Sequence, residues 1–216
     1  MTPELKEIKR LYRRYMNGMV AQSMRDKGMP YRVNFGLTMP LLRRIAEGIS
    51  PGREIAEELW QDKGVRESML LAPMVYPAAE FGYADACRWV QEIPTTEVAD
   101  FCCKFLFAAI PSARQLSVEW ITSEIDMVAY AGYRLAYGLW NSAVDDAFVR
   151  SIACRALPCE GAERGAVSAM ARQWLIEGMM RPEAAGTIVS CMALCEGLDA
   201  ERVARIRAFG SDLADD

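Results

Sequence analysis

The sequence predicts an all-α protein, and three observations lead to that expectation. Apolar residues recur about every three to four positions along almost the whole chain, which is the period of an α-helix. Long alternating runs of β-branched residues, which would indicate strands, are missing. Helix-capping residues, or prolines suited to a first helical turn, precede successive apolar segments. The 216 residues, 52% hydrophobic and 25% charged, suffice for a sizeable core.

The first helix is expected over residues 3–16. Thr2 can cap it and Pro3 suits its first turn. At about 100° per residue its apolar and basic residues separate onto two sides. The apolar side holds Leu5, Ile8, Leu11, Tyr12 and Tyr15, and the basic side holds Lys6, Lys9, Arg10, Arg13 and Arg14.

Similar signals divide the rest of the chain into short helices. Examples of these helix N-terminal signals are Thr38-Met39-Pro40, Ser50-Pro51-Gly52 and Arg181-Pro182-Glu183. About twelve helices joined by short connections follow from these signals. They are expected near residues 3–16, 39–48, 52–61, 65–76, 80–92, 96–109, 112–124, 126–139, 143–155, 160–177, 182–195 and 199–209.

Successive helices can be grouped into pairs that repeat every 30 to 45 residues or so, the range of HEAT-like repeats. We therefore expect an α-α superhelix, a HEAT-like repeat solenoid that forms one domain over residues 1–216. One tryptophan falls in each successive stretch of chain and could fill the core between repeats. These residues are Trp60, Trp89, Trp120, Trp140 and Trp174.

The chain contains no histidine. That absence excludes Ser-His-Asp and Cys-His catalysis and histidine-ligated zinc. The pairs Cys154 and Cys159, Cys191 and Cys195, and the adjacent Cys102-Cys103 lack CxxC spacing and lie in apolar helical sequence, so we expect small buried hydrophobes. Glycine-rich phosphate loops are also missing. We expect neither a metal nor a cofactor.

Charge is unevenly distributed along the chain. Residues 1–50 hold ten Lys and Arg against four Asp and Glu, and residues 51–100 hold four against ten. One basic surface on an acidic body would suit an anionic polymer, although a solvated helix face explains the same pattern. Seven cysteines and 13 methionines suit a reducing cytoplasm. Uncharged stretches reach only 12 residues, as in Ala184 to Cys195, too short to span a membrane, and the polar N-terminus lacks a signal region.

Several segments resemble the HEAT-like repeat DNA alkylation repair enzymes, bacterial alkylpurine DNA glycosylases. Residues 35–46, FGLTMPLLRRIA, resemble the early Met-Pro turn of that family. Residues 55–60, IAEELW, and 66–72, RESMLLA, resemble the next two helices, and residues 120–124, WITSE, resemble its Trp-x-x-Ser-Glu turn. The similarity is fairly continuous over residues 30–140 and thinner beyond.

The resemblance places the catalytic carboxylate of the family at Asp100. In the family a Trp precedes it by four residues, and this chain has Thr96 there, which offers no ring to stack on a base. A second family aromatic would fall near Arg172, and Trp174 lies about 200° around the helix from that position. The paired arginines of relatives correspond to Ala129-Tyr130, and Arg134 is the nearest cation.

The resemblance implies that five cations, in segments that resemble the family, contact the phosphates of DNA without reading its bases. Solvation explains each of them as well. The five are Lys104, Arg134, Arg172, Arg43 and Arg44.

The family reaction suits a chain without histidine. N3- and N7-alkylated purines are cationic and leave without protonation, so one carboxylate can stabilise the developing oxocarbenium ion and orient water. The resemblance thus implies an enzyme that binds double-stranded, alkylated DNA and hydrolyses the N-glycosidic bond through Asp100. Two alternatives stay open: Asp100 as a surface residue that pairs with Lys104, and a catalytically degenerate relative that acts as a DNA-binding or protein-interaction scaffold.

Overall fold

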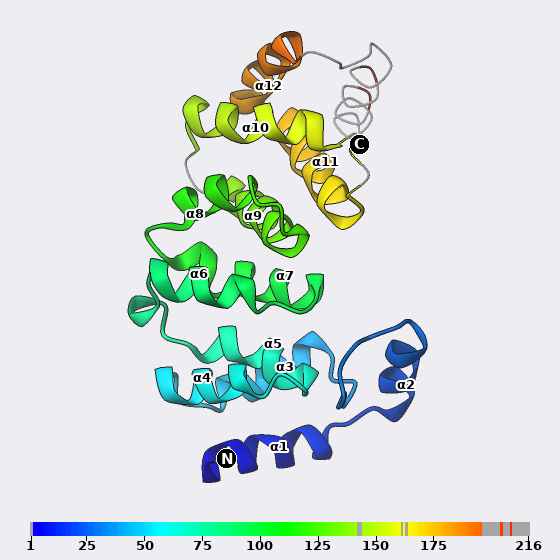
Figure 1. Cartoon of the computed structure of the whole chain (residues 1–216). Coiled ribbons are helices and arrows are strands. Elements are labelled where there is room, and N and C mark those ends of the chain that lie inside the picture. Colours follow the sequence, from blue (N-terminus) through cyan, green and yellow to red (C-terminus); the bar gives the residue numbers. More distant parts are fainter. Residues whose placement is uncertain are drawn as a thin grey trace. The chain divides into compact units, whose positions relative to one another are not determined.

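A computed structural model describes residues 2–141, 144–160, 162, 164–195, 204 and 208. The chain divides into two compact units, Met1–Gly82 and Tyr83–Asp216 (Figure 1). The prediction of one domain over residues 1–216 stays a prediction, and each unit is described by itself.

Both units consist of short helices. The first contains α1 Pro3–Arg14, α2 Gly18–Asp26, α3 Met39–Glu47, α4 Arg53–Gln61, α5 Arg66–Val75 and the 3₁₀ helix η1 Ala78–Glu80. The second contains α6 Tyr83–Gln91, α7 Thr96–Phe105, η2 Phe107–Ala109, α8 Ala113–Trp120, α9 Asp126–Gly138, η3 Leu139–Asn141, α10 Asp146–Glu160, α11 Ala166–Met179 and α12 Pro182–Leu194.

The all-α prediction is confirmed over the described residues, which hold no strand and one isolated bridge between Val33 and Val65. Helix α2 was not predicted, because it buries only Ala21 and so lacks an apolar stripe. The helix expected over 96–109 ends at Phe105, since Leu106 leaves the helical region at φ −131° and ψ −59°. The last expected helix, 199–209, lies outside the described residues apart from 204 and 208.

Two predicted boundaries in the second unit were also wrong. The helix expected over 143–155 runs instead over Asp146–Glu160 and contains Pro158, which cannot donate a backbone hydrogen bond to the carbonyl of Cys154. The helix expected over 160–177 begins at Ala166, since Gly165 precedes it with a left-handed φ of +53°.

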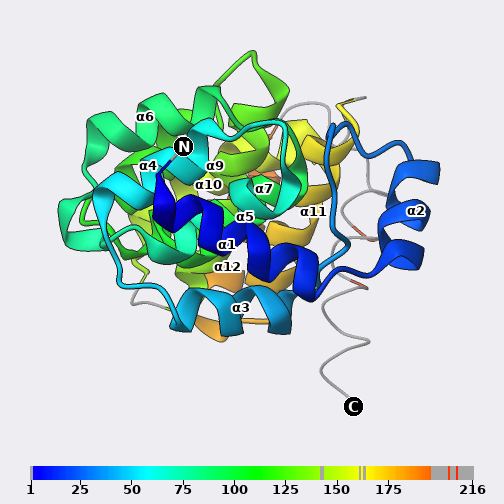
Figure 2. The same cartoon turned by 90° about the horizontal axis from the view of Figure 1, so that it is seen from below.

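A buried ion pair fastens the loop before α3 in the first unit. Glu67 on α5 is 0% exposed and accepts the backbone N–H groups of Phe35, at 3.1 Å, and Leu37, at 3.3 Å. The guanidinium of Arg66 donates to Glu67 and to the carbonyl of Leu37, both at 3.1 Å. Between the two amides Gly36 adopts φ +70°, where a Cβ would collide with the backbone of Asn17 and Ala21. Figure 2 shows α2 off to one side of α1 and α3.

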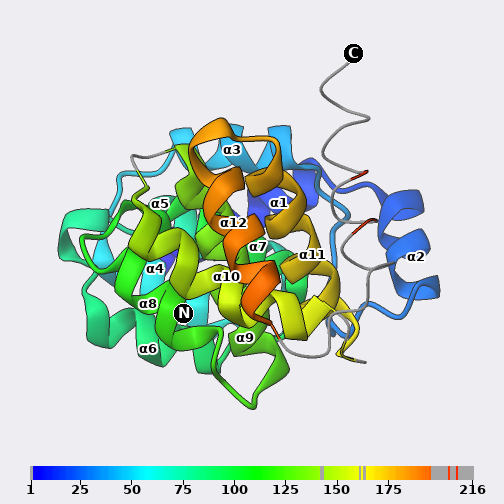
Figure 3. The same ribbon diagram turned by 90° about the horizontal axis from the view of Figure 1, so that it is seen from above.

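The second unit is arranged in two layers. Helix α9 packs on α7 and on α11, so these three alternate helices form one layer. Helix α10 packs on α12 and contacts α8 in the other layer, and Figure 3 shows α12 crossing over α10. Consecutive helices α8 and α9, and α10 and α11, pack against each other across the layers. This is the arrangement of stacked helical pairs.

The expected core tryptophans are all buried: Trp60, Trp89, Trp120, Trp140 and Trp174. The cysteine prediction holds for Cys102, Cys103 and Cys191. It was wrong for Cys154, which is exposed on α10, and only partly right for the half-buried Cys159 and Cys195. Among the described residues no helix has the length and apolarity to cross a membrane.

Candidate nucleic-acid interface

The sequence-predicted residues of the second unit lie on the layer formed by α7, α9 and α11. Asp100 and Lys104 belong to α7, Arg134 to α9 and Arg172 to α11. A helix in such a layer buries one side and leaves another open to solvent. On α9 the open side carries Tyr130, Arg134 and Tyr137, three to four residues apart and all half-buried.

Asp100 receives two hydrogen bonds from α9. The phenol of Tyr130 and the Nε of Arg134 both donate to Asp100 Oδ1 at 2.9 Å. The side chain of Asp100 is 42% exposed and that of Arg134 is 22% exposed. We call Asp100, Tyr130 and Arg134 the Asp100 cluster; it links α7 to α9 at the solvent boundary.

The Asp100 carboxylate affects both of its hydrogen-bond donors, Tyr130 and Arg134. Burial and the neighbouring Asp100 carboxylate raise the pKa of the Tyr130 phenol above its ordinary value, so it stays a donor at neutral pH. Arg134 uses Nε for Asp100, and its guanidinium lies 5.5 Å from the ring centroid of Tyr137. Within the described chain its two terminal nitrogens take part in no hydrogen bond, and a guanidinium presents them as a fork suited to phosphate.

The expected pair of Asp100 with Lys104 was wrong for the described structure. Both residues lie on α7 at i and i+4, but Asp100 pairs with Arg134 from the next helix of the layer. A planar guanidinium with a second donor beside it is a stronger partner than a flexible ammonium. Lys104 is exposed, with its Nζ 5.7 Å from the ring centroid of Phe105.

The layer continues to α11 through a second contact. The phenol of Tyr137 donates to Glu177 Oε2 at 3.4 Å, and Glu177 pairs with Arg181 at 2.7 Å. Arg172 is exposed on α11, about 140° around the helix from Glu177. The structure therefore brings Asp100 and Arg134 together and places Arg172 toward a different edge of α11.

Neither family aromatic is replaced by a tryptophan at this surface. Thr96 is half-buried in the first turn of α7. Trp174 is 0% exposed and stacks on Trp140 with ring centroids 4.8 Å apart, so it belongs to the core. Tyr130 of α9 is the aromatic side chain that hydrogen-bonds the Asp100 carboxylate.

The two remaining predicted residues, Arg43 and Arg44, belong to the first unit. Both are exposed on α3, and Arg44 lies in its last turn. Their helix begins after the loop held by Glu67.

The sequence had assigned no role to Tyr130 or Tyr137. Tyr130 appeared only as the residue standing where relatives carry arginine. The available signal was the spacing of 130, 134 and 137, which places the three on one side of a helix. That spacing does not reveal the neighbouring helix, because the partner Asp100 is 30 and 34 positions away.

The chemistry open to this surface is that of a carboxylate and an oriented guanidinium. Asp100 Oδ2 takes no hydrogen bond within the described chain, so it can face a developing positive charge. Among the described residues no group of three or more acidic or cysteine side chains is placed to hold a metal ion.

Comparison with known proteins gives two matches. The family model described as DNA alkylation repair enzyme matches residues 7–135. One solved structure comes from a protein family described as related to the HEAT-like repeat DNA glycosylases, with affinity for branched DNA structures. It matches with a TM-score of 0.76 at 14% identity and covers 88% of this chain and 80% of that chain. A comparison with curated proteins finds no match.

The solved relative shows the fold, which is that of the HEAT-like repeat DNA glycosylases. The family model spans more than half of the chain. By that match, this protein belongs to the DNA alkylation repair enzyme family.

Proposed function

We propose that the protein binds double-stranded DNA through the α7–α9–α11 layer, with the Asp100 cluster at the centre and Lys104 and Arg172 as outlying phosphate contacts. The supporting observation is the orientation of Arg134. Asp100 holds its Nε at 2.9 Å, so the terminal nitrogens are presented for a phosphate without the entropy cost of ordering a mobile side chain.

Branched DNA is the preferred substrate in this proposal. The solved relative comes from a family with affinity for branched DNA structures. A junction offers double-stranded arms and unstacked bases at one place, and the half-buried tyrosines beside Arg134 can stack on such bases. We place the protein in the cytoplasm, with its DNA.

Fluorescence anisotropy with a labelled linear duplex and a labelled four-way junction tests the binding proposal. We expect salt-dependent binding of both, with the junction bound more tightly. Arg134→Lys should lower affinity about tenfold or more, because a lysine keeps the charge and loses the oriented fork. The matched control is Arg150→Gln, which removes an exposed cation from α10. Equal affinity of wild type and Arg134→Lys would contradict the assigned site, and no binding at low salt would contradict the function.

Excision of alkylated purines is a second candidate activity, and the exposure of Asp100 favours it. The carboxylate is 42% exposed and keeps Oδ2 unengaged by the described residues, so it can stabilise an oxocarbenium ion and orient the attacking water. N3- and N7-alkylated purines leave as neutral bases without an acid.

The activity assay is release of methylpurine from alkylated duplex DNA. Asp100→Asn should reduce release by about a hundredfold or more, the scale of losing one oriented electrostatic group. The same variant should keep or increase DNA affinity, since the amide oxygen can still accept from Arg134 while one negative charge is removed. Release that survives Asp100→Asn would exclude Asp100 as the catalytic residue. No release by wild type at high protein concentration would leave a noncatalytic DNA-binding relative.

A further inference from the structure

A second basic surface lies on α1 in the first unit. Among the described residues, a shallow hollow of about 220 Å³ is lined by Lys6, Lys9, Arg10 and Arg13. These four residues occur at i, i+3, i+4 and i+7, so one side of α1 presents them in two adjacent rows. We call them the cationic face of α1.

The cationic face carries a net positive charge after its own ion pairs are counted. Lys9 pairs with Asp62 at 2.8 Å and Arg10 pairs with Glu7 at 2.6 Å. Within the described residues no ion pair involves Lys6 or Arg13.

The like charges of the cationic face destabilise α1. Lys6 and Arg10, and Lys9 and Arg13, are like-charge pairs at i,i+4, which destabilise a helix. Lys6 also lies near the N-terminus, where the helix dipole favours acids. The ion pairs of Lys9 and Arg10 relieve part of this repulsion, and an anion in the hollow would relieve more of it.

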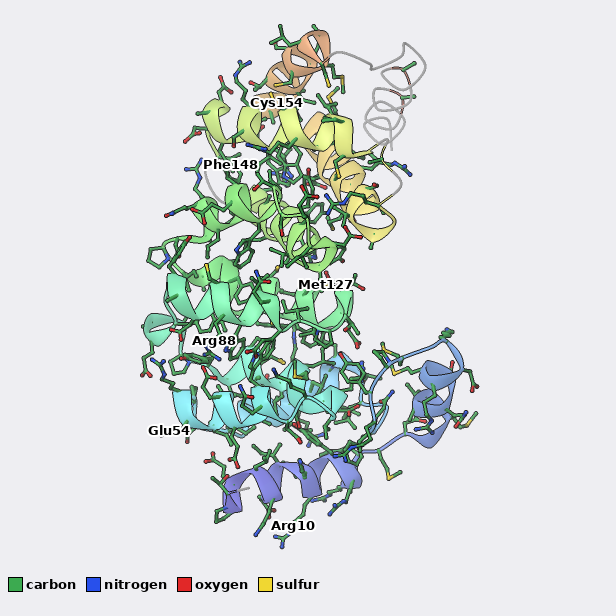
Figure 4. All side chains as sticks on the ribbon, viewed as in Figure 1. Arg10, Glu54, Arg88, Met127, Phe148 and Cys154 are labelled. Carbon is green, nitrogen blue, oxygen red and sulfur yellow. The ribbon has the colours of Figure 1, made fainter. Side chains whose placement is uncertain are left out.

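Three members of the cationic face, Lys6, Arg10 and Arg13, are exposed, and Lys9 is half-buried beside Asp62. Leu5, Ile8 and Tyr12 are buried on the opposite side of α1, which packs on α4. The N-terminal end is fixed as well, because the backbone N–H of Thr2 donates to Glu58 at 2.7 Å. Figure 4 shows Arg10 pointing away from α1 on the side opposite α4.

The chemistry of the hollow fits a phosphodiester backbone. Seven residues of helix advance about 10 Å, which is long enough for the face to contact more than one phosphate of a DNA strand. A lipid surface fits less well, since the apolar side of α1 that would enter a membrane is buried against α4. An acidic protein partner would need apolar anchors, and the hollow has cations only.

We propose that the cationic face of α1 is a second DNA-phosphate-binding surface, separate from the α7–α9–α11 layer. The inference rests on the proposed DNA-binding function and assigns a further contact to it. With two phosphate-binding surfaces, one protein can engage two stretches of the same DNA, as a branched substrate offers.

The test compares wild type, Lys6→Gln/Arg10→Gln/Arg13→Gln and Arg134→Lys, each as full chain, in anisotropy titrations with the duplex and the junction at several salt concentrations. The triple variant should bind both DNAs at least tenfold more weakly. Its slope of log K against log salt should be less negative by up to about 2.7, because each of the three lost phosphate contacts removes about 0.9. A control with the same loss of charge, Lys27→Gln/Arg53→Gln/Arg150→Gln, should keep the wild-type slope. Melting curves identify any variant that is not folded.

The outcomes separate the two proposals. If wild type binds and Arg134→Lys weakens binding while the α1 triple variant keeps wild-type affinity and slope, the inference is wrong and the function stands. If only the α1 triple variant weakens binding, the inference stands and the assigned α7–α9–α11 site is wrong. Equal losses in the α1 triple variant and the charge control would overturn the inference, since net charge alone would explain them. Wild type that binds no DNA would overturn both proposals.

Discussion

Glu67→Ala should unfold the first unit at a much lower denaturant concentration than wild type, with a loss of about 3–5 kcal/mol in free energy of unfolding. The substitution leaves the guanidinium of Arg66, which is 3% exposed, without its carboxylate. It also removes the acceptor of the Phe35 and Leu37 amides. Chemical denaturation followed by circular dichroism measures the change.

Two further variants accompany this test: a surface control, and a double variant that shows which part of the stability loss comes from the unsatisfied amides. Exposed Glu47→Ala on α3 should change stability by less than about 0.5 kcal/mol. Arg66→Met/Glu67→Leu removes both charges, which in an isolated buried pair is often neutral. Here it should stay strongly destabilised, because the amides of Phe35 and Leu37 remain unsatisfied. Wild-type stability of this double variant would show that the loop does not depend on Glu67.

Gly132→Ala is expected to destabilise the second unit by about 1–3 kcal/mol, although alanine is the better helix former. A Cβ at this position of α9 would lie 2.6 Å from the backbone nitrogen of Ile121 and 2.9 Å from the carbonyl carbon of Trp120. Both are backbone atoms at the end of α8, so relief requires the two helices to separate. Loss of the close α8–α9 approach would also displace Arg134, and DNA affinity should fall in the same variant.

Gly138 in the same helix supplies the control. A Cβ there has nothing within 4 Å. Gly138→Ala should therefore leave stability unchanged or raise it by up to about 1 kcal/mol. Thermal unfolding of the two alanine variants side by side gives the comparison, and equal effects in both would contradict the close-packing explanation for Gly132.

Helical periodicity predicts most of this fold because each long helix buries an apolar stripe. The same rule misses α2, which buries only Ala21. Helix α2 is held instead by contacts at its N-terminus. The backbone N–H of Asn17 donates to the carbonyl of Phe35 at 2.8 Å, and the side-chain Oδ1 of Asn17 accepts the backbone N–H of Val20. The contact with Phe35 comes from a distant loop, and no local pattern contains it.

Two of the three residues of the Asp100 cluster were named from the sequence, but the cluster itself was not. The family resemblance names Asp100 and Arg134 separately, and the i,i+4 rule suggests Lys104 as partner for Asp100. The actual partners come from α9, because alternate helices pack side by side in one layer. Which faces of α7 and α9 meet is set by tertiary packing. The burial of Trp174 was predicted, but its stacking on Trp140 depends on how η3 meets α11.

The attachment of the Phe35–Leu37 loop to Glu67 also orders events during synthesis. The amide of Leu37 and its acceptor are 30 residues apart in the chain. At about 5–20 residues per second, a ribosome needs roughly 2–6 s to add the missing acceptor after Leu37 is made. Until α5 is made, the loop before α3 lacks Glu67 as its acceptor, so the first unit can reach its native arrangement only after α5 has been translated.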